Sequence, residues 1–109
     1  MAKRVYDLEN RLIEFAARVI DVAEALPNTK AANYIAGQLN RCGMAPALLY
    51  GEAQAAESRD DFIHKMKVVL KELKETRVCL KLITRKEMIK PATRLKDLLK
   101  ECEELVGIV

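Results

Sequence analysis

Apolar residues recur every three or four positions along the first quarter of the chain. Between Val5 and Leu26 they alternate with polar residues such as Glu14 and Asp21, which fall on the other side of a helix that turns by about 100° per residue. Pro27 then interrupts the pattern, because proline cannot donate the next helical hydrogen bond. The pattern predicts a long amphipathic helix. Its apolar stripe is Val5, Leu8, Leu12, Phe15, Val19, Val22 and Leu26, widened by Ile13, Ala16, Ile20 and Ala23.

The second helix is predicted to begin where Asn28 or Thr29 can cap it and to end near Gly51. We expect a bend before Pro46, since its ring leaves the carbonyl of Cys42 without a helical donor. From Cys42 to Gly51 the helix carries no charge and is apolar on two sides, and one small bundle cannot cover both. One face holds Ile35, Leu39, Cys42, Pro46 and Leu49. The other face, Gly37, Met44, Leu48 and Gly51, is predicted to be an oligomer interface.

Two further helices follow. Ser58 is placed to cap the third helix, which the apolar pattern extends to about Ile83. Pro91 suits the first turn of the fourth helix, and Gly107 is predicted to end it. The predicted core positions are Phe62, Met66, Val69, Leu73, Leu80 and Ile83 in the third helix, with Ile63 and Leu70 alongside, and Leu95, Leu98, Leu99, Cys102, Leu105 and Val106 in the fourth.

These four amphipathic segments predict an all-α fold in one domain, residues 1–109, with short connections between neighbouring helices. An up-down-up-down four-helix bundle with a kinked second helix is the predicted architecture. A helical hairpin that assembles with partners is the alternative.

Composition narrows the class of protein. The 109 residues include 19 basic and 16 acidic side chains, for a formal net charge of +3, which permits a nucleic-acid partner without requiring one. The three cysteines are widely spaced, without the spacing of a zinc site, and this indicates free thiols in a reducing compartment. No secretory or membrane-spanning pattern occurs in the sequence. We therefore expect a cytoplasmic protein with no metal, no cofactor and no membrane partner.

Five basic residues of the third helix fall within a sector of about 80°, beside the predicted apolar stripe. Such a row of cations can bind RNA phosphates, and a ring of subunits would repeat it. The alternative is a solvated face balanced by Asp60, Glu72 and Glu75. We call this row the basic ladder; it consists of Lys67, Lys71, Lys74, Lys81 and Arg85.

A polar network is the second candidate site. Arg77 points in nearly the same direction as Met66, within the predicted stripe, and a guanidinium cannot remain unpaired in a core. Glu52 is the expected partner of Arg77 or of Arg41. The network either fixes the register of the helices or lines a small-molecule pocket. Its predicted members are Tyr34, Gln38, Arg41, Glu52 and Arg77.

Residues for catalysis are scarce. His64 is the one histidine, Ser58 is used as a helix cap, and the cysteines occupy helical core positions, where thiols pack as small apolar groups. We predict no catalytic residues.

Several motifs resemble a known bacterial family. They are Tyr50-Gly51-Glu52-Ala53, the start Ser58-Arg59-Asp60-Asp61-Phe62-Ile63-His64, and the run from Leu70 to Thr76. In this order they resemble the four-helix-bundle proteins found in intervening sequences of large-subunit ribosomal RNA genes. The resemblance implies a left-handed bundle and a cyclic homopentamer, without an established activity. Met44, Ala45 and Leu49 depart from the family pattern toward apolar residues, which favours packing over a polar site at the bend.

A related branch, the accessory variability protein of diversity-generating retroelements, is a basic pentamer that binds reverse transcriptase and nucleic acid. The resemblance therefore implies a non-enzymatic, homo-oligomeric scaffold or adaptor, with RNA or an RNA-handling protein as its partner. A purely structural or protein-binding module is one alternative. A small-molecule binding bundle that uses Arg41, Glu52 and Arg77 is another.

Overall fold

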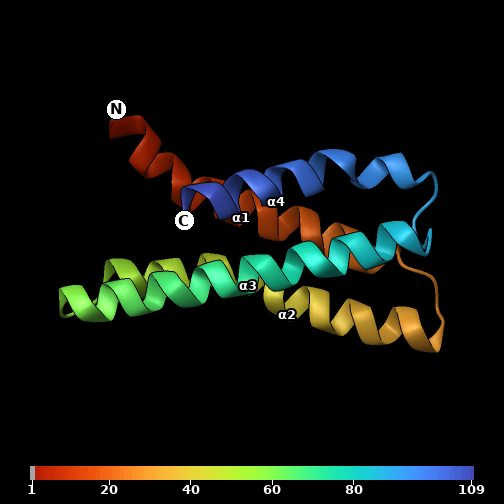
Figure 1. The fold of residues 1–109 in the computed structure, drawn as a ribbon, viewed down its shortest axis with the longest axis horizontal. Helices are drawn as coiled ribbons and strands as arrows, with labels where there is room; N and C mark the ends of the chain where they lie inside the picture. The colour runs from red at the N-terminus through yellow and green to blue at the C-terminus, as the bar shows by residue number, and fades with distance from the viewer. Residues whose placement is uncertain (1) are drawn as a thin grey trace.

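The computed structural model describes the backbone of residues 2–109 and the side chains of residues 7–109. Its helices are α1 (Ala2–Ala25), α2 (Lys30–Gln54), α3 (Arg59–Arg85) and α4 (Lys96–Ile108), with a short 3-10 helix, η1 (Ala92–Leu95), before α4. Successive helices lie beside one another and run in opposite directions (Figure 1). No strand occurs between residues 2 and 109. The predicted all-α, up-down-up-down four-helix bundle is confirmed.

The caps of the two central helices lie where the sequence placed them. Thr29 Oγ1 accepts a hydrogen bond from the Ala32 amide at 3.1 Å, and Ser58 Oγ accepts one from the Asp61 amide at 3.1 Å. Each cap satisfies an amide that has no partner inside its helix. Between the caps, α2 stays helical through Pro46 and changes direction along its length as it passes behind α3 (Figure 1).

The start of the fourth helix differs from the prediction. Pro91 does not lie in the first turn of α4; it precedes η1, and α4 begins only at Lys96. The 3-10 turn buries Leu95, which is 2% exposed, so packing of this side chain decides the local geometry. Gly107 also does not end α4, which continues to Ile108.

The core lies where the apolar stripes of the four helices meet. Its fully buried side chains come from every α-helix and include Leu12, Phe15 and Val19 of α1, Leu39 and Cys42 of α2, Leu73 and Leu80 of α3, and Cys102 and Leu105 of α4. Gly43 allows α1 and α2 to approach closely. A Cβ atom at this position would lie 2.4 Å from Val19 Cγ1, so only glycine fits without a shift.

Helix α3 is rotated relative to its predicted stripe. Phe62 and Ile63, expected in or beside the core, are each 40% exposed because they lie at the start of α3; Leu80, five full turns after Phe62 and on the same side of the helix, is fully buried. Further along α3, Glu72, Thr76 and Cys79 are buried beside the predicted stripe. The most extensive helix pair is α2 with α3, and it turns this side of α3 inward. Arg41 of α2 makes burial of Glu72 possible by donating a hydrogen bond to its carboxylate at 3.1 Å.

The helices α1 and α3 lie diagonally across the bundle. The backbone of each lies close to α2 and α4, whereas the backbones of α1 and α3 do not come close to each other within the described residues. The outer faces of α1 and α3 therefore point to opposite sides of the molecule.

Candidate interaction surfaces

The basic ladder lies fully on the solvent face of α3. All five of its side chains are exposed, and no carboxylate among residues 7–109 lies within ion-pairing distance of them. Because α3 is rotated, the ladder points directly away from the buried stripe instead of lying beside it. Lys67, Lys71 and Lys74 surround a hollow of about 320 Å³.

Two of the three acidic residues expected to balance the ladder face elsewhere, and only Asp60, at the start of α3, shares the side of the ladder. Glu72 and Glu75 are on the side of α3 that contacts α2, where both accept hydrogen bonds from Arg41. The positive charge of the ladder is therefore not compensated by these two carboxylates.

An apolar groove runs along the surface between α1 and α2. Leu48 is 69% exposed and Ile13 is 51% exposed, which is unusual for large aliphatic side chains close together on one surface. The predicted interface residues Gly37 and Gly51 are exposed, and Met44 is half-buried. The groove has a volume of about 300 Å³ and is lined by Ile13, Ala16, Ala17, Ile20, Met44, Ala47 and Leu48.

The α1 half of this groove was not recognised in the sequence. The predicted core stripe of this helix includes Ile13 and Ile20, but both are exposed, at 51% and 36%. The width of the apolar stripe indicates this surface, since one helix of a small bundle cannot bury so broad an apolar face.

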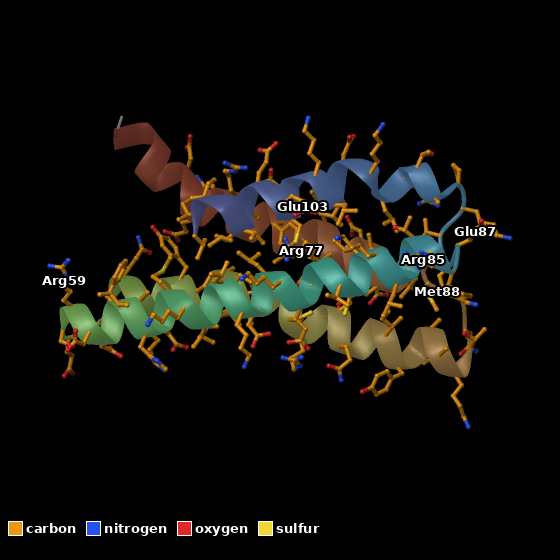
Figure 2. The ribbon with its side chains drawn as sticks, viewed as in Figure 1. Arg59, Arg77, Arg85, Glu87, Met88 and Glu103 are labelled. Atoms are coloured by element: carbon orange, nitrogen blue, oxygen red, sulfur yellow. The ribbon has the colours of Figure 1, made fainter. Side chains whose placement is uncertain are left out.

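The predicted polar network is not formed. Arg77 pairs with Glu103 of α4 at 3.0 Å, and the two side chains meet between α3 and α4 (Figure 2). Glu52 instead accepts a hydrogen bond from Lys65 at 3.1 Å. The predicted pairing of Arg77 with Glu52 is wrong. Glu52 lies beside Lys65 of α3, and Arg77 is twelve residues further along that helix, about 18 Å away along its axis.

The remaining members of the network divide between solvent and a separate cluster. Tyr34 is 72% exposed. Gln38 accepts a hydrogen bond from Arg41 at 3.1 Å, and Arg41 also pairs with Glu72 and Glu75. This cluster joins α2 to α3 on the surface, whereas the pair of Arg77 and Glu103 joins α3 to α4.

A further ion pair joins α1 to α4 and was not foreseen. Arg11 donates two hydrogen bonds to the carboxylate of Glu101, at 3.0 and 2.9 Å, and a third to Glu104 at 3.2 Å. The hydrogen bond to Glu101 raises the pKa of Arg11 above its ordinary value. A single sequence gives no sign of such a long-range pair.

The three thiols are buried and free. Burial raises the pKa of Cys102 to about 12, so this thiol stays protonated at neutral pH. Its Sγ lies 3.4 Å from the Leu73 carbonyl, to which it donates a weak hydrogen bond. The sulfur atom therefore contributes to packing and not to nucleophilic chemistry.

Two general findings limit the types of site. No described helix is both long and apolar enough to cross a membrane. Within the same residues, histidine, cysteine and carboxylate side chains do not gather in any group of three suited to a metal ion.

Comparison with known proteins places the chain in a family. The family model described as 23S rRNA-intervening sequence protein matches residues 5–109. The chain belongs to this family. No curated protein matches the chain.

A solved structure of a family relative supports the fold. It is a protein of unknown function from the S23 ribosomal protein family of Bacteroides thetaiotaomicron VPI-5482. The two chains are 29% identical, the match covers 93% of each, and the TM-score is 0.85. Neither the family description nor this neighbour indicates an enzyme.

Proposed function

We propose that this protein is a non-enzymatic, homo-oligomeric adaptor that contacts RNA through the basic ladder of α3. One observation carries the RNA contact: five exposed cations share one face of a helix and lack carboxylate partners among the described residues. When such cations bind the phosphates of an RNA strand, the counterions that surrounded those phosphates are released into solution. This release favours binding.

The hollow at the start of the ladder suits a phosphate group. Lys67, Lys71 and Lys74, together with Leu70, line one open hollow of about 320 Å³. Lysine recognises phosphate as a point charge, without reading the bases. Few exposed aromatic side chains are available for base stacking, so we expect little sequence preference.

Self-association is the second part of the proposal. The exposed apolar groove between α1 and α2 supports it, because contact with another chain would remove Ile13, Ile20 and Leu48 from water. We propose a ring of five copies, the assembly that the family resemblance implies. A ring repeats the ladder around its rim and turns a modest local charge into an extended positive field.

Two alternatives differ in how well the geometry supports them. The apolar groove equally suits a purely protein-binding module, in which the partner of the adaptor is an RNA-handling protein. The small-molecule alternative required Arg41, Glu52 and Arg77 to converge, and these residues lie in three separate ion pairs.

Filter binding to mixed-sequence single-stranded RNA at low salt tests the RNA contact. We expect the affinity of the wild-type protein to fall as salt rises. Replacing Lys67, Lys71 and Lys74 together by glutamine should weaken binding and lower the slope of log affinity against log salt by about 2, since each phosphate contact on a single strand contributes about 0.7.

A matched control separates the effect of the ladder on RNA binding from the effect of net charge. The triple variant Lys30→Gln, Lys96→Gln and Lys100→Gln removes the same charge from exposed positions outside the ladder. It should bind nearly as the wild type does. If both triple variants lose the same affinity for RNA, the ladder is not the binding site. If the wild-type protein does not bind RNA, an adaptor that binds only proteins is the better proposal.

A further inference from the structure

The basic ladder has one gap. Its members follow one another at alternating steps of four and three residues, and this alternation leaves one position without a cation, between Lys74 and Lys81. Val78 occupies that position; it points within the same sector of α3 and is 55% exposed. The ladder therefore consists of two groups of cations on either side of an apolar side chain. The first group is Lys67, Lys71 and Lys74, and the second group is Lys81 and Arg85.

The two groups are held at a fixed separation. Helix α3 is continuous from Arg59 to Arg85 and contains no proline, so the whole ladder lies on one unbroken helix (Figure 1). With a rise of about 1.5 Å per residue, the centres of the two groups are about 18 Å apart along the helix axis. A rigid ligand that contacts both groups must therefore present two sets of negative charge at a similar separation.

A single RNA strand does not present its charges in this way. It is flexible, and proteins that bind single strands combine cations with aromatic side chains on which the bases stack. The ladder lacks such a platform: Phe62, the one phenylalanine, tyrosine or tryptophan of α3, points about 140° around the helix from Lys67. The sector of α3 that carries the ladder can hold phosphates but cannot hold bases.

A double helix of RNA presents what the ladder requires. Its bases are stacked on one another inside the duplex, so binding needs no aromatic platform. Its phosphates form two rows that border a wide, shallow minor groove, and proteins recognise double-stranded RNA mainly by contacts to phosphates and 2′-hydroxyl groups across this groove. If α3 crosses the groove, each group of cations meets one row, and Val78 lies over the groove, where there is no phosphate to neutralise.

We propose that the basic ladder binds double-stranded RNA, with α3 across the minor groove, the first group on one phosphate row and the second group on the other. The inference rests on the RNA contact proposed above and specifies the form of RNA that the ladder takes. Contacts to phosphates carry no sequence information, so any duplex of sufficient length should bind.

A comparison of nucleic acids tests the inference. Wild-type protein is titrated at low salt with a mixed-sequence RNA duplex, with each of its strands alone, and with the DNA duplex of the same sequence. We expect the RNA duplex to bind about tenfold more tightly than either strand, because its two phosphate rows are already in place and need not be ordered by the protein. It should also bind more tightly than the DNA duplex, whose minor groove is only about 6 Å wide.

The outcomes separate this inference from the RNA contact itself. Equal affinity for the RNA duplex and its strands would contradict the inference, while the ladder would remain an RNA-binding surface. Equal affinity for the RNA and DNA duplexes would contradict the placement across the minor groove. If wild-type protein binds no RNA, the proposed function and the inference both fail.

Removal of one group tests the contact with two rows. The double variant Lys81→Gln and Arg85→Gln keeps the first group and should lose the preference for the duplex, because only one phosphate row is then held. The control, Lys96→Gln with Lys100→Gln, removes the same charge from exposed positions of α4 and should keep the preference. Equal fractional losses of affinity for duplex and single strand in the ladder variant would contradict the two-row contact.

Filling the gap distinguishes a strand that follows the ladder from a duplex that crosses it. Val78 is more than half exposed, so we expect Val78→Lys to stay folded. The variant should bind a single strand more tightly, and the slope of log affinity against log salt should steepen by about 0.7, because one more phosphate is contacted. Affinity for the RNA duplex should change little, since the added ammonium group lies over the groove. Ile108→Lys, at a side chain that is 52% exposed on α4, is the control for added charge. A gain for the duplex as large as that for the strand would contradict the proposed orientation of α3.

Discussion

At the scale of single residues, Gly43 sets how closely α1 and α2 approach. A methyl group at this position would overlap Val19, whose Cγ1 lies 2.4 Å from the site of the Cβ atom. Valine is branched at Cβ and has few other rotamers, so it cannot move away cheaply. A small residue is therefore required at this crossing.

We predict that Gly43→Ala lowers the free energy of unfolding by about 1–2 kcal/mol, because overpacking outweighs the gain of about 1 kcal/mol in helix propensity. Chemical denaturation measures the change. Gly107→Ala, where nothing lies within 4 Å, is the control and should cost nothing. Val19→Ala should cost less in the Gly43→Ala background than in the wild type, because it then also relieves the overlap; strict additivity of the two changes would argue against direct contact.

The ion pair between Arg77 and Glu103 is weaker than a buried pair. The side chains are 28% and 45% exposed, so solvent screens their attraction. We predict that Arg77→Ala costs less than about 1 kcal/mol, in place of the 3–5 kcal/mol typical of a buried pair that loses one partner. A double-mutant cycle with Glu103→Ala should give a coupling of about 0.2–1 kcal/mol. Coupling of Arg77 to Glu52 instead would show that the predicted network forms after all.

The sequence pattern predicts only some of these contacts. The caps Thr29 and Ser58 follow from local chemistry, since a side-chain oxygen and an amide three residues later need no tertiary information. The partner of Arg77 depends on how α4 lies against α3, and no local pattern contains that information. Local contacts were therefore predicted, and long-range pairs were not.

At the scale of the helices, the cap of α2 is a direct test of how its ends are stabilised. Thr29→Ala removes the acceptor of the Ala32 amide and should cost about 1 kcal/mol. Thr29→Ser keeps the oxygen and should restore most of that loss. Thermal unfolding of both variants measures the difference. Equal melting temperatures for the two would mean that the hydroxyl contributes nothing.

The number and approximate extent of the helices were predictable from sequence, but the start of α4 at Lys96 and the rotation of α3 were not. Its apolar positions form a broad band, and Phe62 and Val69 both suited the centre of that band. Contact with α2 decides the rotation, because Arg41 donates a hydrogen bond to the carboxylate of Glu72 and so allows the side with Glu72, Thr76 and Cys79 to face inward. The same rotation turns the basic ladder directly toward solvent.

At the scale of the whole molecule, two surfaces of different character lie on different sides of the bundle. The groove between α1 and α2 is apolar, and the outer face of α3 is basic. The sequence predicted the α2 half of the groove, because a helix that is apolar on two sides needs two partners. The α1 half emerged only when the bundle left Ile13 and Ile20 uncovered.

Self-association is the central claim, since the repetition of the basic ladder around a ring depends on it. Multi-angle light scattering of the purified wild-type protein at micromolar concentration tests it most directly. We predict a single species of five times the chain mass of 12.3 kDa, stable to dilution within that range. A stable species of 12.3 kDa would contradict the account.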